Sequence, residues 1–319
     1  MHQNTLQTFT KTKNPNSIFF STVSLNILKS PILFLVLCLV NPFPSVEQRA
    51  SATPFTKTLH NLRGIRKGQE ANGVGTLRSY LSHLGYQINK QSSSNNNFDE
   101  NVESALKHYQ EFHHLHTGGV VDDQTIRTMS LPRCGLPDIT TIANPNPNPN
   151  DLSSAPQNYT YFPGNPRWSK FSLTYRHSSS ARVSISMNEV RQAMRNAFET
   201  WGENNSFSFT ETSGSSDMVY GFHRGFHFDL NPFDGQNGVL AHAYAPEDGR
   251  LHFDGAERWT TTGSGIDFQT VGLHEIGHIL GLGHSNVSDA VMAPTYTEIR
   301  RSLTQDDRDG LNNLYGFYN

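Results

Sequence analysis

Hydrophobic residues recur with helical spacing in the first part of the chain. The segment TLRSYLSHLG has one apolar face and ends at Gly85, and FDENVESALKHYQEFHHL places Val102, Leu106, Tyr109 and Phe112 on one face. A third stretch, DDQTIRTM, is short and begins with aspartates that can cap a helix. This pattern predicts a small three-helix unit within residues 51–138.

A different pattern follows residue 157, where strand-like and helix-like segments are mixed. FSLTYRHS and FSFTE alternate with the two-residue period of half-buried strands. SMNEVRQAMRNAFETWG lies between them and repeats its apolar residues with helical spacing. Two more helices are predicted, one from near Asp267 to Gly281 and one in QDDRDGLNNLYG. Residues 158–319 are therefore predicted to form an α+β domain with three helices.

An Asn- and Pro-rich stretch, ANPNPNPNDLSSAP, separates these two regions. Proline lacks a backbone N–H and fixes φ, so repeated Asn-Pro forms neither a helix nor a central strand. We therefore predict an exposed linker at residues 139–157, where an activating protease can cut the chain.

The N-terminal residues contain a short apolar core, PILFLVLCLV, which is preceded by lysines and followed by small residues. About ten apolar residues are too few to span a bilayer comfortably, so residues 1–50 are predicted to be a secretory signal peptide, with a signal anchor as the alternative. Its cleavage would remove Cys38 and leave Cys134 as the only thiol. Secretion also agrees with three N-x-S/T sequons, at Asn158, Asn204 and Asn286. No stable membrane anchor is expected.

The segment HEIGHILGLGH, residues 274–284, carries the clearest chemical signal. His274 and His278 are four residues apart, so one face of the predicted helix presents both imidazoles. Gly281 can adopt the positive φ that ends the helix, and the chain can then return His284 as a third ligand. Three histidines leave one position of a tetrahedral zinc open for water, and Glu275 is placed to take a proton from that water.

This segment resembles the long zinc-binding signature of the metzincins, and the following Ser285 is typical of the matrix metalloproteinases, or matrixins. The helical unit resembles the peptidoglycan-binding-like prodomain of that family, and PRCGLPD, residues 132–138, resembles its cysteine-switch motif. The resemblance implies a metzincin zinc-protease domain with a twisted, mostly parallel sheet and three helices. It implies the compact layout of plant matrixins, without a C-terminal hemopexin propeller.

The resemblance extends to residues that follow the zinc signature. Met292, in VMAPTY, resembles the methionine turn that lies beneath the zinc in this family. Asp306 and Asp307 match the acidic pair of the C-terminal helix. One of them would bind the new N-terminal ammonium after activation, and the other would support the methionine turn.

Substrate-binding residues are expected on two segments. The strand VLAHAY, which contains Leu240 and Ala241, should offer its edge to an extended peptide. Pro294 and Tyr296 fall where the family builds the wall of its S1′ pocket. Together these segments predict a cleft for polypeptide substrates.

A second group of candidate ligands lies in HFDLNPFDGQNGVLAHAYAPEDGRLHF. Three histidines and a carboxylate can close a tetrahedral structural zinc. Residue by residue, the group resembles the matrixin structural site at His227, Asp229, His242 and His252. His223 is a rival ligand. The same region resembles a calcium site built from carbonyls and carboxylates, at Asp234, Gly235, Asn237, Val239, Asp254 and Glu257.

Cys134 lies between two prolines and has no disulfide partner once the signal peptide is removed. A thiolate is a strong zinc ligand, and the catalytic zinc has one open position, so Cys134 is predicted to bind that zinc in a latent form. Gly135 allows the backbone to approach the cleft closely, and Arg133 can pair with Asp138 to hold the loop.

The chain has 319 residues, is 17% charged and carries a net charge of −3, so no basic surface suggests nucleic acid. The prediction is a zinc endopeptidase made as a latent zymogen, secreted to the extracellular space or cell wall, where it cleaves proteins. It would use two zinc ions and at least one calcium ion. Two alternatives remain: a wall-polysaccharide-binding module with a degenerate metal domain, and a zinc hydrolase of wall peptides.

Overall fold

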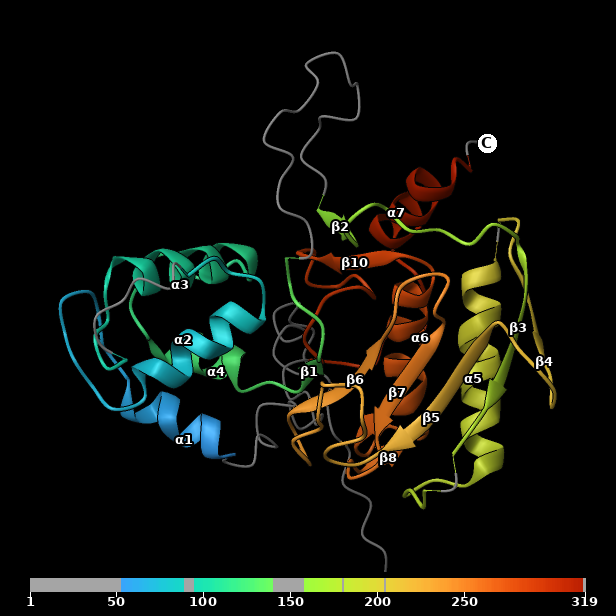
Figure 1. Cartoon of the computed structure of the whole chain (residues 1–319), viewed down its shortest axis with the longest axis horizontal. Coiled ribbons are helices and arrows are strands. Elements are labelled where there is room, and N and C mark those ends of the chain that lie inside the picture. The colour runs from blue at the N-terminus through green and yellow to red at the C-terminus, as the bar shows by residue number, and fades with distance from the viewer. Residues whose placement is uncertain (1–52, 89–94, 140–157, 180, 204, 318–319) are drawn as a thin grey trace, which may run out of the picture. The chain divides into compact units, whose positions relative to one another are not determined.

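The computed structural model describes residues 53–88, 95–139, 158–179, 181–203 and 205–317 (Figure 1). The predicted signal peptide, almost all of the predicted linker and the sequon at Asn204 lie outside these residues. Within the described ranges, no helix has the length and apolar character needed to cross a membrane.

Four helices form the N-terminal part of the described chain. They are α1 (Pro54–Asn61), α2 (Val74–His83), α3 (Glu100–Phe112) and α4 (Asp123–Met129). The last three are the helices that the sequence predicts, and α1 is an addition to the predicted three-helix unit. An eight-residue helix spans barely two turns, so its periodicity is weak; its signal is Pro54 after Thr53, whose side chain caps the first turn.

These helices pack around a hydrophobic core of their own. Its fully buried members include Leu59, Leu77, Leu81, Tyr86 and Tyr109. Asp99 and Asp122 begin α3 and α4, and their carboxylates accept backbone N–H groups of the first turn at 3.0 and 2.8 Å. The N-terminal part is therefore a folded unit with capped helices.

The C-terminal part is built on a six-stranded sheet. Its strands, in spatial order, are β1 (Arg133–Cys134), β6 (Val239–Ala243), β7 (Arg250–Asp254), β5 (Met218–His223), β3 (Ser172–His177) and β4 (Ser208–Glu211). Every neighbouring pair is parallel except β6 and β7, which confirms the predicted mostly parallel sheet. The edge strand β1 belongs to the segment that follows the four helices.

Three further helices complete this part, as predicted: α5 (Met187–Gly202), α6 (Phe268–Ile279) and α7 (Gln305–Tyr315). Figure 1 shows α5 and α6 beside the sheet. Tyr175 of β3 stacks on Phe198 of α5 with ring centroids 4.0 Å apart, and Phe253 of β7 contacts Phe268 of α6 at 4.6 Å. These contacts bury the apolar faces of both helices against the sheet, which is the α+β arrangement.

Two short sheets flank the large one. Strand β2 (Tyr159–Tyr161) pairs antiparallel with β10 (Leu282–Ser285), and β8 (Trp259–Thr260) pairs with β9 (Ile266–Asp267). β10 follows α6 after one turn, and Gly281 in that turn has a φ of 103°. A Cβ at Gly281 would collide with the carbonyl of Pro166 and crowd Leu314. Glycine is therefore required both by backbone angle and by space.

We predict that Gly281→Ala destabilises the protein more than Gly164→Ala does. Both glycines have positive φ, but a Cβ at Gly164 meets nothing within 4 Å. Gly164→Ala should cost about 1–2 kcal/mol of unfolding free energy from backbone strain alone. Gly281→Ala should add about 1–3 kcal/mol from overpacking. Equal losses in denaturant unfolding would show that the space around Gly281 is not restrictive.

Candidate metal centres and active site

The three histidines of the sequence signature meet in one buried place. α6 carries His274 and His278, and the turn at Gly281 returns His284 on β10. The Nε2 atoms of His274 and His278 are 3.0 Å apart, and Cys134 Sγ lies 3.4 Å from Nε2 of His278. One ligand atom from each of these three histidines and Cys134 lies within 4.8 Å of every other. The structure thus brings together all four predicted ligands.

The opposite ring nitrogen, Nδ1, of each histidine is hydrogen-bonded to a backbone carbonyl. This contact fixes the ring and leaves Nε2 free to bind a metal. In the order His274, His278 and His284, the acceptors are the carbonyls of Val291 at 2.7 Å, Leu282 at 2.8 Å and Pro137 at 2.9 Å.

The electrostatics of this cluster suit a cation. Burial lowers the pKa of His274 to about 4 and holds the pKa of His278 and His284 well below the usual range, so the imidazoles are neutral. Among the described residues, Nε2 of His284 and both carboxylate oxygens of Glu275 are buried without a hydrogen-bond partner. Orphaned buried acceptors of this kind are costly unless a metal or water satisfies them. The donor set therefore fits zinc.

Glu275 lies next to the first ligand and is not itself part of the ligand group. Its side chain is fully buried, and burial raises the pKa of its carboxyl to about 8. A carboxylate whose pKa is raised toward neutrality can accept a proton from water and later release it.

The segment around Cys134 fills the cleft beside this cluster. Gly135 N donates to the carbonyl of Ala241 at 2.8 Å, and Cys134 N donates to the carbonyl of Pro294 at 2.9 Å. β1 therefore lies between the edge of β6 and the 294–296 segment. Only a cavity of about 30 Å³ remains, and it is lined by Cys134, Leu240, Glu275, Pro294 and Tyr296, among others.

The second cluster gathers its four predicted ligands around one carboxylate oxygen. Oδ2 of Asp229 lies 2.7 Å from Nε2 of His227, 2.7 Å from Nε2 of His242 and 2.8 Å from Nδ1 of His252. Burial lowers the pKa of His252 to about 4 and also lowers that of His242. The rival His223 stacks on His227 and His252 but is not a member of the ligand group. Four converging donors make this a closed set.

Comparison with known proteins agrees with this geometry. The family model described as Matrixin matches residues 167–316, and the model described as Putative peptidoglycan binding domain matches residues 70–129. Metalloendoproteinase 1-MMP of Arabidopsis thaliana is 39% identical over 293 residues, which cover 86% of this chain and 79% of that protein. The chain belongs to the matrixin family. Matrixins are zinc-dependent, and this matrixin is accordingly a zinc metalloendopeptidase.

Other relatives show the same extent of likeness. Metalloendoproteinase 1 of Glycine max is 35% identical over 292 residues, covering 87% of this matrixin and 93% of the relative. Matrilysin of Homo sapiens is 35% identical over 261 residues, covering 78% of this chain and 89% of its own length.

The segment predicted to form the methionine turn lies beside the first cluster. Met292 is buried, and its sulfur lies against Gly277, the residue before the second ligand. The backbone N–H groups of Val291 and Met292 each donate to one oxygen of the Asp307 carboxylate at 3.0 Å. Asp306 instead accepts the hydroxyl of Ser285 at 2.7 Å. One carboxylate of the acidic pair thus holds the turn, and the other lies beside β10.

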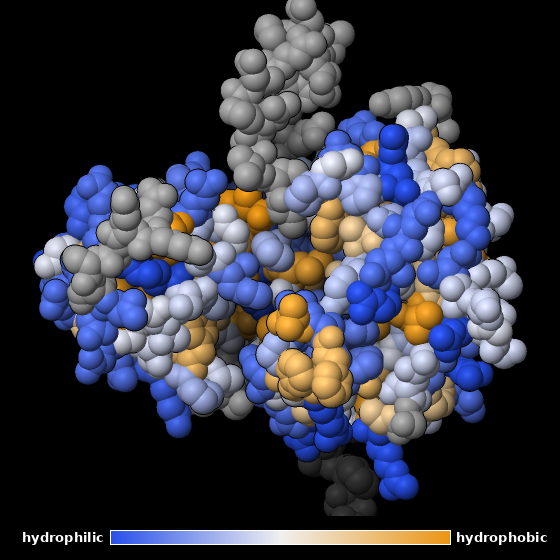
Figure 2. Space-filling view, viewed as in Figure 1, coloured by the Kyte–Doolittle hydropathy of each residue, from blue (hydrophilic) through white to orange (hydrophobic). Residues whose placement is uncertain are grey.

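The loop that carries two ligands of the second cluster exposes hydrophobic side chains. Phe226, Phe228 and Leu230 alternate with His227 and Asp229 and are 62%, 89% and 86% exposed. Phe228 and Leu230 have φ values of 67° and 69°, a region that non-glycine residues rarely adopt. Figure 2 shows hydrophobic residues exposed low in the middle of the view, where the chain leads into β6. Because His227 and Asp229 point into the cluster, the residues that alternate with them face the solvent.

The predicted calcium residues lie close to the start of β6. Asn237 N donates to Glu257 Oε1 at 2.7 Å, and Gly235 N donates to Asp254 Oδ2 at 3.2 Å. Val239 N donates to Asp234 Oδ1 at 2.8 Å. Burial raises the pKa of Glu257 to about 7 and also raises that of Asp254. Within the described ranges only the two histidine clusters bring three such side chains to one point, so these carboxylates do not converge as tightly.

Two residues that hold the Cys134 segment were not predicted from the sequence. Arg133 pairs with Asp138, as predicted, but Tyr86 also donates to the Asp138 carboxylate at 2.9 Å, and His113 lies 3.3 Å from it. Burial alone would raise the pKa of Asp138, but Arg133 and His113 outweigh it and hold that pKa below its usual range. No motif marks these two residues, because they are distant in sequence and meet Asp138 only in the fold.

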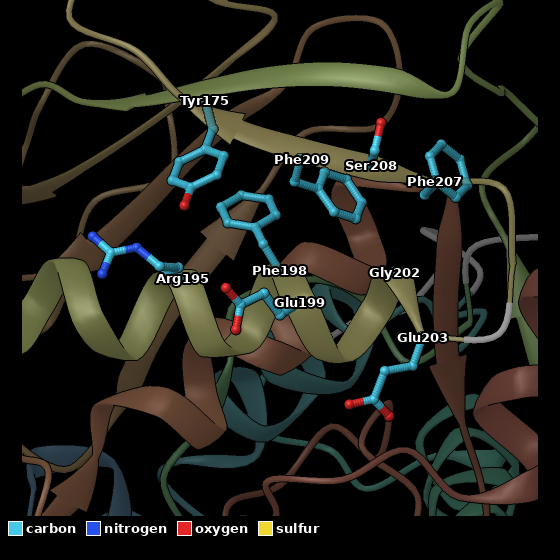
Figure 3. Close-up of a pocket in the computed structure, with 9 residues that line it drawn as sticks. All are labelled: Tyr175, Arg195, Phe198, Glu199, Gly202, Glu203, Phe207, Ser208 and Phe209. Carbon is cyan, nitrogen blue, oxygen red and sulfur yellow. The ribbon is translucent and has the colours of Figure 1, made fainter.

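A larger cleft, of about 260 Å³, lies away from both clusters. Figure 3 shows it between α5 and the β3–β4 edge, with the rings of Tyr175, Phe198 and Phe209 on its walls. Arg195 and Glu199 add charges but no histidine or cysteine contributes. This cleft lacks the histidines and thiol that could hold a metal, so the smaller, filled cleft at α6 is the candidate active site.

Proposed function

We propose that this matrixin is made as a latent precursor, is secreted, and cleaves extracellular polypeptides. In this proposal residues 1–50 are a signal peptide, 51–138 a prodomain, 139–157 a linker cut by an activating protease, and 158–319 the catalytic domain. The observation that carries the proposal is the position of Cys134 Sγ, 3.4 Å from His278 Nε2 and within the ring of three histidines.

The roles proposed for the catalytic residues follow from their positions. Zinc supplies Lewis-acid chemistry in such a site, because it lowers the pKa of water and polarises a carbonyl oxygen. Glu275 takes a proton from the attacking water and delivers it to the leaving amine. The β6 edge at Leu240 and Ala241 aligns the peptide backbone. Pro294 and Tyr296 shape the pocket for the side chain that follows the cleaved bond.

Latency is proposed to have two parts, since the Cys134 segment takes two places that catalysis needs. Its thiol lies where the fourth ligand of the zinc belongs. Its backbone donates a hydrogen bond to the Pro294 carbonyl, accepts one from Tyr296 N, and pairs with β6, the edge proposed for substrate. Burial raises the pKa of the Cys134 thiol, but a metal cation reverses this effect because it stabilises the thiolate.

We further propose two zinc ions and at least one calcium ion per chain. The support for a structural zinc is the closed set of four donors around Asp229. The support for calcium is that Asp254 and Glu257 are both buried carboxylates with raised pKa values. A bound cation would lower these pKa values again. The remaining proposed calcium ligands are Asp234, Gly235, Asn237 and Val239.

Activation is proposed to occur by cleavage in the linker. β2 pairs with β10, and Asn158 accepts a hydrogen bond from Asn286 N at 2.9 Å, so the chain after the cut stays docked. The mature N-terminus would lie between Asn158 and Phe162. Asp306, beside β10, is proposed to bind the new ammonium group.

We expect Glu275→Gln to keep the fold and the metal content but to lower kcat/KM for a peptide about a hundred- to ten-thousand-fold. The amide keeps the shape of the side chain but cannot accept the proton. Activity on a quenched fluorescent peptide and metal analysis of the processed protein measure the two properties. Near wild-type cleavage would remove Glu275 from the role of base.

His242→Ala should remove one zinc per chain and lower the thermal midpoint, because a closed site contributes folding energy. His223→Ala is the matched control, since the His223 ring contacts the ring of His252 but is not part of the ligand group. Its zinc content should equal that of the wild type. An unchanged zinc content in His242→Ala would remove the structural site.

Cys134→Ser should yield a precursor that cleaves itself without an added protease, because a hydroxyl binds zinc far more weakly than a thiolate. Gel analysis over time follows the conversion. The double variant Cys134→Ser/Glu275→Gln is the control and should remain uncut. A Cys134→Ser precursor as stable and as inactive as the wild type would contradict the switch.

A further inference from the structure

The outer contacts of the three zinc-binding histidines differ in origin. His274 and His278 donate Nδ1–H to the carbonyls of Val291 and Leu282, which belong to the same domain as the rings. His284 has its Nδ1 contact, at 2.9 Å, with the carbonyl of Pro137. That carbonyl precedes the linker, so cleavage there separates it from His284. This argument rests on the proposed activation.

The Pro137 carbonyl is rigidly positioned by the helical unit. The next residue, Asp138, is fully buried, and its N–H donates to the carbonyl of Leu84 at 3.0 Å. Its carboxylate accepts the hydroxyl of Tyr86 at 2.9 Å and pairs with Arg133. The acceptor for His284 is therefore anchored in the core of the prodomain.

The described residues of the catalytic domain offer no second acceptor at this nitrogen. The other polar neighbour of His284 Nδ1 is Asp138 Oδ1 at 3.7 Å, and it belongs to the same removable segment. β10 and β2 fix the backbone of His284 instead, where Thr160 Oγ1 donates to its carbonyl at 2.9 Å. When the segment leaves, the ring keeps its place in the chain but loses the partner that orients it.

We propose that the prodomain, besides supplying the Cys134 thiol of the proposed switch, also supplies the Pro137 carbonyl as the acceptor that orients His284. Outer-shell partners of this kind change metal affinity about 10- to 100-fold. The precursor therefore binds its catalytic zinc more tightly than the mature enzyme, even when the thiol is absent. By linkage, zinc strengthens prodomain docking by the same factor.

Zinc affinity at equilibrium tests the proposal, because an equilibrium constant does not depend on how easily a chelator reaches the site. All proteins carry Glu275→Gln to prevent self-cleavage. Two forms of the Cys134→Ala protein are titrated against a chromogenic zinc chelator. One is the uncut precursor, and the other is the same protein after an added protease has cut the linker and the prodomain has been removed. A His278→Ala variant measures how much of the bound zinc belongs to the second cluster.

The uncut Cys134→Ala precursor should bind catalytic zinc about 10- to 100-fold more tightly than the processed form. Equal affinities would overturn the proposal. Tyr86→Phe in this precursor should lower the affinity toward that of the processed form, because Asp138 loses a partner. Tyr109→Phe is the matched control, since its buried hydroxyl makes no hydrogen bond to Asp138. Equal effects of the two changes would overturn the anchoring through Asp138.

A second measurement needs no change at Cys134. In NMR spectra of the zinc-loaded Glu275→Gln precursor, the Nδ1–H of all three zinc-binding histidines should be protected from exchange with water. After processing, the proton of His284 should exchange rapidly, while those of His274 and His278 stay protected as internal controls. Protection of His284 in both forms would overturn the proposal. Neither measurement uses peptide cleavage, so a failure here is distinguishable from a failure of the proposed enzymatic role.

Discussion

The convergence of three neutral imidazoles in a buried pocket is the constraint on which the rest of this matrixin depends. The Nε2 atoms of His274 and His278 lie 3.0 Å apart, and Nε2 of His284 has no hydrogen-bond partner among the described residues. This arrangement is costly in free energy unless a cation binds the three nitrogens. The surrounding elements keep that geometry. α6 sets the spacing of two rings, Gly281 returns the third, and Asp307 fixes the turn whose carbonyl at Val291 orients the first.

The proposed latency and the proposed catalysis depend on the same two features of the site. A substrate would need the position beside the three histidines and the free edge of β6, and the Cys134 segment lies at both. The hydrogen bonds that hold this segment run to the catalytic domain on one side and, through Asp138, to Tyr86 and His113 of the helical unit on the other. The segment is therefore a bridge between two cores, which explains why a short two-residue strand can be held firmly.

The second cluster lies in a part of the chain that has little regular structure, and the proposed structural zinc would stabilise it. The loop before β6 lacks its own hydrophobic core, and two of its residues, Phe228 and Leu230, adopt left-handed backbone angles. His227 and Asp229 connect the loop to β6 and β7 through contacts with His242 and His252, which lie opposite each other. Metal coordination can supply here the stability that burial of side chains does not.

The sequence by itself determined the features that depend on short spacings. Helical periodicity and capping residues predicted α2 to α7 but not α1, whose two turns carry little pattern. The four-residue spacing of His274 and His278 follows from one helical turn. Only the tertiary structure decided which distant groups meet. Tyr86, His113 and the Pro137 carbonyl act on the site through contacts that span 25 to 147 residues. No local pattern encodes such contacts, because chain packing alone brings these residues together.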